Sequence, residues 1–549
     1  MNGNMMNHPL LISDLIEHAA KYYPTSEIVS QRLEGDIHRY TYKDANRRSK
    51  QLANALTHSS INQGDRIGTL AWNGYRHYEI YYAASGMGAI THTINPRLFP
   101  EQLVYIINHA EDRMLFVDLT FIPLLETIQT QIPSVETIVI MADSDHMPAT
   151  SLTEGPCSVI CYETFIADAS ETYDWPQLDD ETAAAICYTS GTTGNPKGVV
   201  YSHRSTLLHA FASAIPEALS ISSRSTLLPV VPMFHVCAWG TPYSATLSGA
   251  KLVFPGAALD GESLATLIEA EQPTLLLGVP TIWLGLLQYL KEHSIRLNSV
   301  ENIVIGGSAA PRSMIQSFDE DHDAFVMHAW GMTEMSPIGT IGAYTREMGN
   351  ISKEERYSLQ QKQGRPVFGV QLKIINDDGE IQPNDGIAFG RLMVKGPWII
   401  ERYFNAESTA LENGWFDTGD VATLDSQGYM KIVDRNKDVI KSGGEWISSI
   451  DLENAAVGHP AVQEACVIGI QHPKWDERPL LLVIKQQGQS VSKDDIIDHL
   501  SSKVAKWWLP NDVVFVDELP HTATGKLLKV NLRDQFGDHY INLQNSSPS

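Results

Sequence analysis

The strongest chemical signal in the sequence is a short loop that combines glycines, hydroxyl side chains and one lysine. The loop spans residues 188–198 and follows an apolar stretch at 183–187. Its glycines allow the backbone to turn N–H groups inward, and the ammonium group of Lys197 adds positive charge to the hydroxyl donors. Such a loop is suited to hold a polyphosphate. The residues expected to bind phosphate are Ser190, Gly191, Thr192, Thr193, Gly194 and Lys197.

This loop is not a Walker motif. Counted from Gly191, the G-x-x-x-x-G-K-[ST] template requires glycine at position 196, where the sequence has Pro196. A surface turn is the alternative interpretation, but ordinary turns seldom concentrate hydroxyls, glycines and one lysine in this way. The loop therefore favours a polyphosphate site outside the Walker class.

Five further motifs follow the loop in order along the chain. They are HAWGMTE at 328–334, GWFDTGD at 414–420, DRNKD at 434–438, KSGGE at 441–445 and TGK at 524–526. Together with the loop, this ordered set resembles the adenylate-forming enzymes, which include acyl-CoA synthetases, luciferases and the adenylation domains of peptide synthetases. One such motif arises easily by chance, but six in the same order do not.

The resemblance implies a reaction in two half-reactions. A carboxylate first attacks the α-phosphorus of MgATP, which gives an acyl-adenylate and pyrophosphate; a thiol then attacks the activated carbonyl and AMP leaves. The implied catalytic residue Lys526 would offset the negative charge that accumulates between the carboxylate and the α-phosphate. Thr189 and Glu334 are the implied magnesium ligands, since their hard oxygen atoms suit this cation.

The same resemblance assigns the nucleotide site. Asp420 would accept both ribose hydroxyls, and Arg435 would contact the ribose or the phosphate from a hinge. The structural alternatives are a helix cap for Asp420 and a surface ion pair for Arg435. The other implied nucleotide-site residues are Gly307, Ser308, Ala309, Ala329, Trp330, Gly331, Thr333 and Lys437.

Residues 441–448 resemble the thiol-side motif of acyl-CoA synthetases. Glycines in this segment would let the thin pantetheine arm pass close to the backbone. The implied coenzyme A residues are Lys441, Gly443, Gly444 and Glu445. Because no carrier-protein region follows Lys526 before the sequence ends, we expect free coenzyme A as the acceptor.

Residues 232–239, PMFHVCAW, resemble the acyl site of the family. Amino-acid-activating relatives have aspartate beside this phenylalanine, whereas the present sequence has His235, and an ammonium group buried without a carboxylate would be costly. We therefore expect an acid with an uncharged tail. Trp239 resembles the aromatic gate of bacterial fatty acyl-CoA synthetases, and Val279 and Trp283 are expected in the pocket wall. A fatty acyl-CoA synthetase is the leading interpretation.

Three alternatives remain open. The substrate of a ligase could be a short sulfur-containing or aryl acid, such as methylmercaptopropionate. A nucleotide-binding protein without turnover is a second alternative, which the presence of Lys526, Glu334 and Asp420 argues against. A luciferase-like oxygenase is the third, and the complete thiol-side loop disfavours it.

Composition supports a globular protein of several domains. The chain has 549 residues, with 65 acidic and 40 basic side chains and a net charge of -25, which disfavours nucleic acid as a partner. Its five cysteines form no C-x-x-C pair, which favours reduced thiols and a cytoplasmic location. We expect neither a secretory leader nor an integral membrane segment. A homodimer is favoured by the resemblance and by the frequency of two-fold assemblies.

The pattern of apolar runs predicts an α/β fold. Short apolar runs alternate with segments of helical period from about residue 65 to 255, and again at 275–279 and 302–305, which indicates parallel sheets covered by helices. After residue 364 the sequence is rich in short strands and turns. We predict a large N-terminal domain at 1–434, with stacked α/β sheets and a β-subdomain, and a small α+β domain at 435–549 that carries Lys526. The family resemblance implies that this small domain is mobile.

Overall fold

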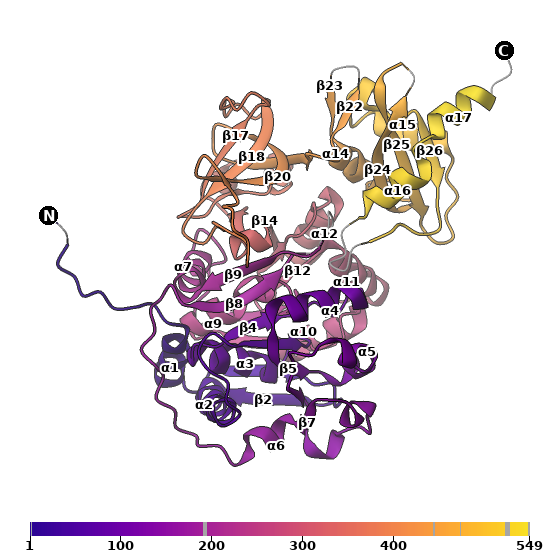
Figure 1. The fold of residues 1–549 in the computed structure, drawn as a ribbon. Helices are drawn as coiled ribbons and strands as arrows, with labels where there is room; N and C mark the ends of the chain where they lie inside the picture. The colour runs from indigo at the N-terminus through magenta and orange to yellow at the C-terminus, as the bar shows by residue number, and fades with distance from the viewer. Residues whose placement is uncertain (2, 190–194, 443–444, 473, 522–526, 547–549) are drawn as a thin grey trace.

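The computed structural model arranges the described part of the chain around four β-sheets (Figure 1). The described residues are 1, 3–189, 195–442, 445–472, 474–521 and 527–546. Several residues expected at the site lie outside them, namely 190–194, 443, 444 and 526. The two large sheets belong to the N-terminal part of the chain, and the two smaller sheets lie together on one side of them (Figure 1).

The first large sheet has seven strands, all parallel except the last at one edge. In spatial order they are β7 (Ser158–Cys161), β6 (Thr137–Ile140), β5 (Asp112–Val117), β3 (Arg66–Leu70), β4 (Ile90–Thr93), β8 (Ala183–Tyr188) and β9 (Gly198–Ser202). Parallel pairing brings the carboxyl ends of these strands to the same edge. The loop that begins at Thr189 therefore leaves this edge from β8.

The second large sheet has nine strands, and its central strands are parallel. In spatial order they are β16 (Arg365–Pro366), β15 (Ile338–Ile341), β14 (Phe325–Gly331), β13 (Asn302–Ile305), β12 (Leu275–Gly278), β10 (Thr226–Pro229), β11 (Lys251–Phe254), β1 (Glu27–Gln31) and β2 (Ile37–Thr41). The segments expected to bind adenine and the acyl group follow the carboxyl ends of β10, β13 and β14. Ligands of α/β proteins commonly bind at such strand ends.

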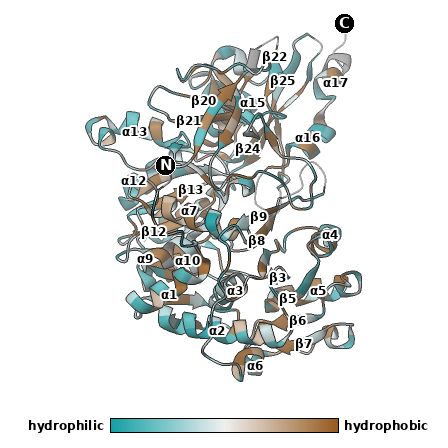
Figure 2. Ribbon diagram, turned by 60° about the vertical axis from the view of Figure 1, so that its left-hand side comes forward, coloured by the Kyte–Doolittle hydropathy of each residue, from teal (hydrophilic) through white to brown (hydrophobic). Residues whose placement is uncertain are grey.

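Helices pack against both large sheets, with apolar residues gathered on the strands and polar residues on exposed helices such as α2 (Figure 2). These helices are α1 (Ile12–Tyr22), α2 (Tyr42–His58), α3 (Tyr75–Gly86), α4 (Pro100–Ala110), α5 (Ile122–Ile128), α6 (Tyr162–Ala167), α7 (His203–Ala214), α8 (Val236–Trp239), α9 (Thr241–Ser248), α10 (Gly261–Glu271), α11 (Pro280–His293), α12 (Arg312–His322) and α13 (Lys353–Gln360). Helix α3 is buried along its whole length. It contacts β4 and β8 of the first sheet, and its Tyr78 and Tyr82 hydroxyls bond to α9 beside the second sheet.

The third sheet is antiparallel and forms the predicted β-rich segment. Its strands are β17 (Gln371–Ile375), β18 (Phe389–Lys395), β20 (Trp415–Leu424), β19 (Leu411–Glu412) and β21 (Met430–Arg435). Asp420 and Arg435 face each other as paired residues of β20 and β21.

The fourth sheet belongs to the C-terminal segment, together with four helices. Its strands are β23 (Glu445–Ile447), β22 (Ile440–Ser442), β25 (Asp476–Lys485), β24 (Val462–His472) and β26 (Asp512–Phe515). The helices are α14 (Ser449–Val457), α15 (Lys493–Ser501), α16 (Lys529–Phe536) and α17 (His539–Ser546). In the described residues no helix is both long and apolar enough to cross a membrane.

The predicted α/β fold is confirmed, and the apolar runs at 275–279 and 302–305 correspond to β12 and β13. Helix α11 follows β12 after Val279. Trp283 of α11 has no exposed surface and belongs to a core cluster with Leu286 and Leu290.

Replacing Trp283 by alanine should therefore lower the free energy of unfolding by about 3–5 kcal/mol, because a large buried side chain leaves a cavity. Leu284, its neighbour on α11, is 41% exposed, and Leu284→Ala should cost far less. Urea unfolding of both variants measures the difference. Equal losses in the two variants would contradict the assignment of Trp283 to the core.

Candidate active site

A cavity of about 610 Å³ lies where the strand ends of the large sheets meet the third sheet and α16. One part of its wall is polar and includes Thr189, Lys197, Glu334, Tyr403, Arg435 and Lys437. The other part is largely apolar and includes Leu219, Val236, Trp239, Leu277, Ile338 and Ile341. The cavity can therefore take a ligand with a charged end and an uncharged end.

The two ends of the glycine-rich loop are fastened to each other. The backbone N–H of Thr189 donates to the carbonyl oxygen of Lys197 at 2.9 Å, and the N–H of Lys197 donates to the Thr189 hydroxyl at 3.1 Å. Both residues line the cavity. The base of the expected phosphate loop thus opens on the polar part of the wall.

Glu334 presents a carboxylate to the same polar wall and is 8% exposed. The Tyr403 hydroxyl donates to its Oε1 at 2.8 Å, and the Lys197 ammonium lies 4.9 Å from the centre of the Tyr403 ring. Burial and the adjacent carboxylate raise the pKa of Tyr403 well above its usual range, so this phenol stays a donor. Tyr403 lies outside the six motifs, and the sequence analysis missed it.

The oxygen atoms of Glu334 and Thr189 fit a magnesium ion bound together with a polyphosphate. In the described part of the chain no group of three or more His, Cys, Asp or Glu side chains gathers to hold a metal. A cation here would take its remaining ligands from phosphate oxygens and water, as Mg²⁺ commonly does.

Asp420 is held by two donors from different elements and is 2% exposed. The indole N–H of Trp330 donates to its Oδ2 at 2.9 Å, and Nε of Arg435 pairs with its Oδ1 at 2.9 Å. A carboxylate offers about four acceptor positions, so two remain for further donors. Asp420 itself is not in the described lining of the cavity, whereas its neighbours Thr418 and Gly419 are.

The other residues expected in the nucleotide site are only partly brought together. Gly307, Ala329, Trp330, Gly331 and Thr333 line the cavity. Ser308 and Ala309 follow Gly307 directly but are not among the described lining residues. At Gly331 an added Cβ would lie 2.1 Å from the carbonyl oxygen of Pro337, so this close approach requires glycine.

The apolar part of the wall contains a left-handed turn that could not be predicted from the sequence. Residues Val236–Trp239 have φ angles of 48, 51, 50 and 58°, and none of them is glycine. Each left-handed residue of this kind costs roughly 1–2 kcal/mol, so the surrounding structure must hold the turn. His235 and Trp239 both line the cavity, and a Cβ on Gly306 would lie 2.9 Å from the Trp239 ring.

Two expected acyl-wall residues lie elsewhere. Trp283 is in the core on the side of α11, where its ring approaches Gly278, and not in the described lining of the cavity. Val279 lies beside Gly307 and is likewise not part of the described lining. The prediction for both rested on their closeness in sequence to a strand end, which does not fix the direction of a side chain.

The C-terminal residues expected at the site do not all line the cavity. Lys437 lines the cavity. Lys441 lies in β22, where its backbone N–H donates to Glu477 at 2.9 Å, and it is not in the described lining. Glu445 pairs with Ser442 across the β22–β23 hairpin.

Comparison with known proteins defines the class. The chain matches the AMP-binding enzyme family over residues 16–404 and the AMP-binding enzyme C-terminal domain over residues 451–526. The chain belongs to the AMP-binding enzyme family. It is 51% identical over 539 residues to the 3-methylmercaptopropionyl-CoA ligase of Ruegeria lacuscaerulensis, which covers 98% of this chain and 99% of that protein.

Two further comparisons are with CoA ligases, one by sequence and one by structure. The medium-chain-fatty-acid–CoA ligase of Ectopseudomonas oleovorans is 48% identical over 548 residues, covering 100% of this chain and 99% of that protein. The solved structure of the anthranilate CoA ligase AuaEII with anthranoyl-AMP has a TM-score of 0.84 at 26% identity, covering 96% and 98% of the two chains. The protein is an AMP-forming acyl-CoA ligase that acts on a carboxylic acid, ATP and coenzyme A and uses Mg²⁺.

One buried group near the cavity makes stability depend on pH. Nε2 of His209 accepts the backbone N–H of Ile338 at 3.2 Å, and burial lowers the pKa of this imidazole from 6.5 to about 3. The neutral imidazole of the folded state stabilises fully above pH 6.5, and its contribution is lost as the pH falls from 6.5 toward 3 because the unfolded chain takes up the proton first.

Between pH 7.5 and pH 5, His209 alone should lower the free energy of unfolding by about 2 kcal/mol. In His209→Gln, where an amide oxygen replaces the acceptor, this part of the loss should disappear. Urea unfolding at the two pH values measures it. The assignment is wrong if the variant and the wild type lose the same free energy over this interval.

Proposed function

We propose that this ligase activates a fatty acid of medium chain length and transfers the acyl group to coenzyme A. The supporting observation is the lining of the cavity, which combines apolar side chains with the polar groups of Glu334 and Lys197. An uncharged tail can lie against Leu219, Leu277 and Ile341 while its carboxylate reaches the polar end. The similarity to a medium-chain-fatty-acid–CoA ligase supports the same substrate class.

In the proposed first step the chain positions ATP and the acid. The loop from Thr189 to Lys197 binds the phosphates, and Thr189 and Glu334 hold Mg²⁺, which when bound neutralises phosphate charge. Tyr403 orients Glu334, and Asp420 accepts the ribose hydroxyls at its remaining acceptor positions. Lys526 approaches the α-phosphate and stabilises the charge that develops as pyrophosphate leaves.

In the proposed second step the thiol of coenzyme A attacks the acyl-adenylate. We place the domain boundary at Asp434 and Arg435, so that 1–434 and 435–549 move relative to each other between the two steps. Lys441, Gly443, Gly444 and Glu445 then form the path of the pantetheine arm. We also propose that the enzyme is cytoplasmic. Its five cysteines, which are all free and buried, support this location.

A second candidate substrate is 3-methylmercaptopropionate. The 51% identity to a 3-methylmercaptopropionyl-CoA ligase favours it. A short thioether tail would fill less of the apolar wall than a medium-chain tail.

The proposed substrate class is tested by measuring AMP and acyl-CoA formation with straight-chain acids of graded length and with 3-methylmercaptopropionate. We expect kcat/KM to rise from short to medium chains, because each buried methylene contributes about 0.8 kcal/mol, or roughly fourfold. A maximum for 3-methylmercaptopropionate would favour the second candidate. Failure of every acid would overturn the proposed function.

The role of Trp330 in the nucleotide site is tested by Trp330→Phe, which keeps an aromatic ring but removes the N–H that holds Asp420. The KM for ATP should rise about tenfold, since a hydrogen bond to a buried carboxylate is lost, while the KM for the acid should change little. The matched control is Trp175→Phe, because the Trp175 indole donates to Glu17 at 3.0 Å outside the cavity. An unchanged KM for ATP in Trp330→Phe would contradict the proposed ribose site.

A further inference from the structure

Beyond its first two residues, the chain that leaves β10 finds backbone partners in side chains of other segments. After Pro229 it forms the segment 230–235 and then the left-handed turn Val236–Trp239. The N–H groups of Val230 and Val231 donate to the carbonyl oxygen of Leu277 on β12. The carbonyl groups of Pro229 and Val231 and the N–H of Met233 are satisfied by one side chain from the segment between β3 and α3.

That side chain is Asn73, which is 3% exposed. Its Nδ2 donates to the carbonyl oxygens of Pro229 and Val231, both at 2.8 Å, and its Oδ1 accepts the N–H of Met233 at 2.6 Å. All three bonds reach the segment just before His235 and the turn. Only a primary amide supplies two donors and an acceptor in this compact form.

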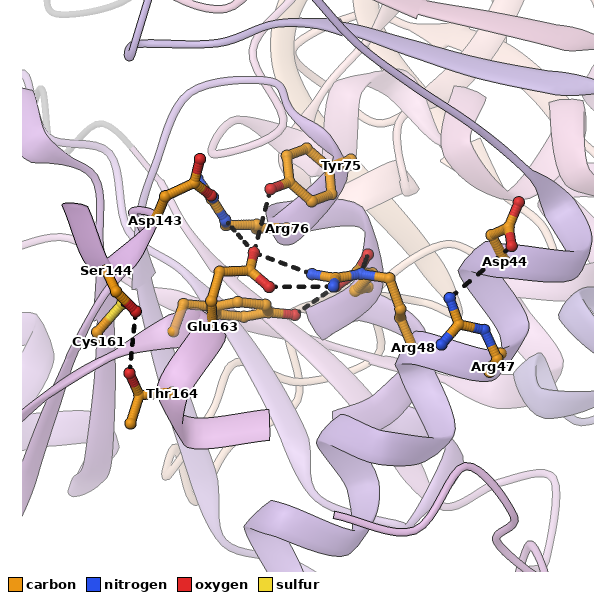
Figure 3. A network of polar contacts seen from close by, with 12 residues as sticks. Asp44, Arg47, Arg48, Tyr75, Arg76, Asp143, Ser144, Cys161, Glu163 and Thr164 are labelled. Atoms are coloured by element: carbon orange, nitrogen blue, oxygen red, sulfur yellow. Dashed lines mark hydrogen bonds and ion pairs between the residues drawn. The ribbon is translucent and has the colours of Figure 1, made fainter. Parts of the chain in front are cut away.

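Several contacts hold the segment that contains Asn73. It lies between β3 and α3, and its backbone forms an isolated bridge with Gly256. Three residues later, Arg76 pairs with Glu163 at 2.9 Å and with Asp143 at 2.5 Å, in the network that holds the start of α3 (Figure 3). From the same helix, the Tyr81 hydroxyl donates to the carbonyl oxygen of Met233 at 2.6 Å.

We propose that Asn73 is a positioning residue for the acyl site, because its amide fastens the segment that holds the left-handed turn in the cavity wall. Through this turn it sets where His235 and Trp239 lie, although it does not line the described cavity. The inference rests on the proposed function, in which the apolar wall binds the tail of the acid. It assigns Asn73 to selection of the acid and not to binding of ATP.

The decisive variant is Asn73→Asp, which keeps the shape of the side chain but places an oxygen against the carbonyl groups of Pro229 and Val231. We expect the KM for a medium-chain acid to rise at least about tenfold, the KM for ATP to stay within about twofold, and the preference among chain lengths to weaken. Tyr81→Phe, which loses the hydroxyl that donates to Met233 and also contacts Cys237, should change the same constants in the same direction but less.

A matched control separates positioning from stability. Asn46 of α2 is also buried, and its Nδ2 donates to Glu17 of α1 at 3.4 Å. Asn46→Asp should lower stability without changing the ratio of the two KM values. If Asn73→Asp alters both KM values in parallel, or neither, the positioning role is overturned.

A second readout does not depend on activity. Cys237 lies within the turn and is 3% exposed, whereas Cys466 is fully buried in the C-terminal sheet. In Asn73→Asp, N-ethylmaleimide should label Cys237 at least about tenfold faster than in the wild type, while Cys466 should keep its rate. Unchanged labelling of Cys237 would overturn the proposal even if the acid kinetics change, since the effect would then not pass through the turn.

The two readouts also separate the proposals from each other. If the wild type forms no acyl-CoA from any acid but Cys237 is labelled faster in the variant, the proposed substrate class fails and the hold of Asn73 on the turn stands. If Cys237 is labelled faster but the KM for the acid is unchanged, the hold is real and the role in acid selection is refuted.

Discussion

A buried backbone group must have a hydrogen-bond partner, and this constraint shapes the cavity. Inside the two large sheets, neighbouring strands supply the partners. Around the cavity, side chains from other elements supply further partners: Asn73 and Tyr81 for the segment after β10, His209 for Ile338, and Tyr201 for the carbonyl oxygen of Thr333. Side chains therefore supply hydrogen-bond partners for the backbone that borders the cavity. Asn73 and Tyr81 hold the segment before Val236–Trp239 in this way, which explains how the left-handed turn is maintained.

The fold could largely be predicted because parallel strands buried on both faces produce continuous apolar runs. The motifs likewise located Thr189, Glu334 and Trp330, which the structure brings to one cavity. Tyr403 could not be predicted, since its contact with Glu334 joins residues 69 positions apart. The left-handed turn could not be predicted from the sequence either, because its four side chains would suit a right-handed helix or a strand equally well.

The polar wall of the cavity contains basic side chains, although the whole protein is acidic. The chain has a net charge of -25, yet the polar wall includes Lys197, Arg435 and Lys437. Local cations and a divalent metal dominate a cleft at short range, because more distant charges are screened beyond about 8–10 Å. An acidic enzyme can thus bind ATP without attracting nucleic acid.

The ion pair between Arg435 and Asp420 crosses the proposed domain boundary, and this has a thermodynamic consequence. Any rotation that carries Arg435 away leaves a carboxylate that is 2% exposed with Trp330 as its described hydrogen-bond donor, and an uncompensated buried charge is unfavourable. A nucleotide whose hydroxyls bind that carboxylate would reduce this penalty. Lobe rotation and nucleotide occupancy are then linked reciprocally, so each shifts the equilibrium of the other by the same free energy.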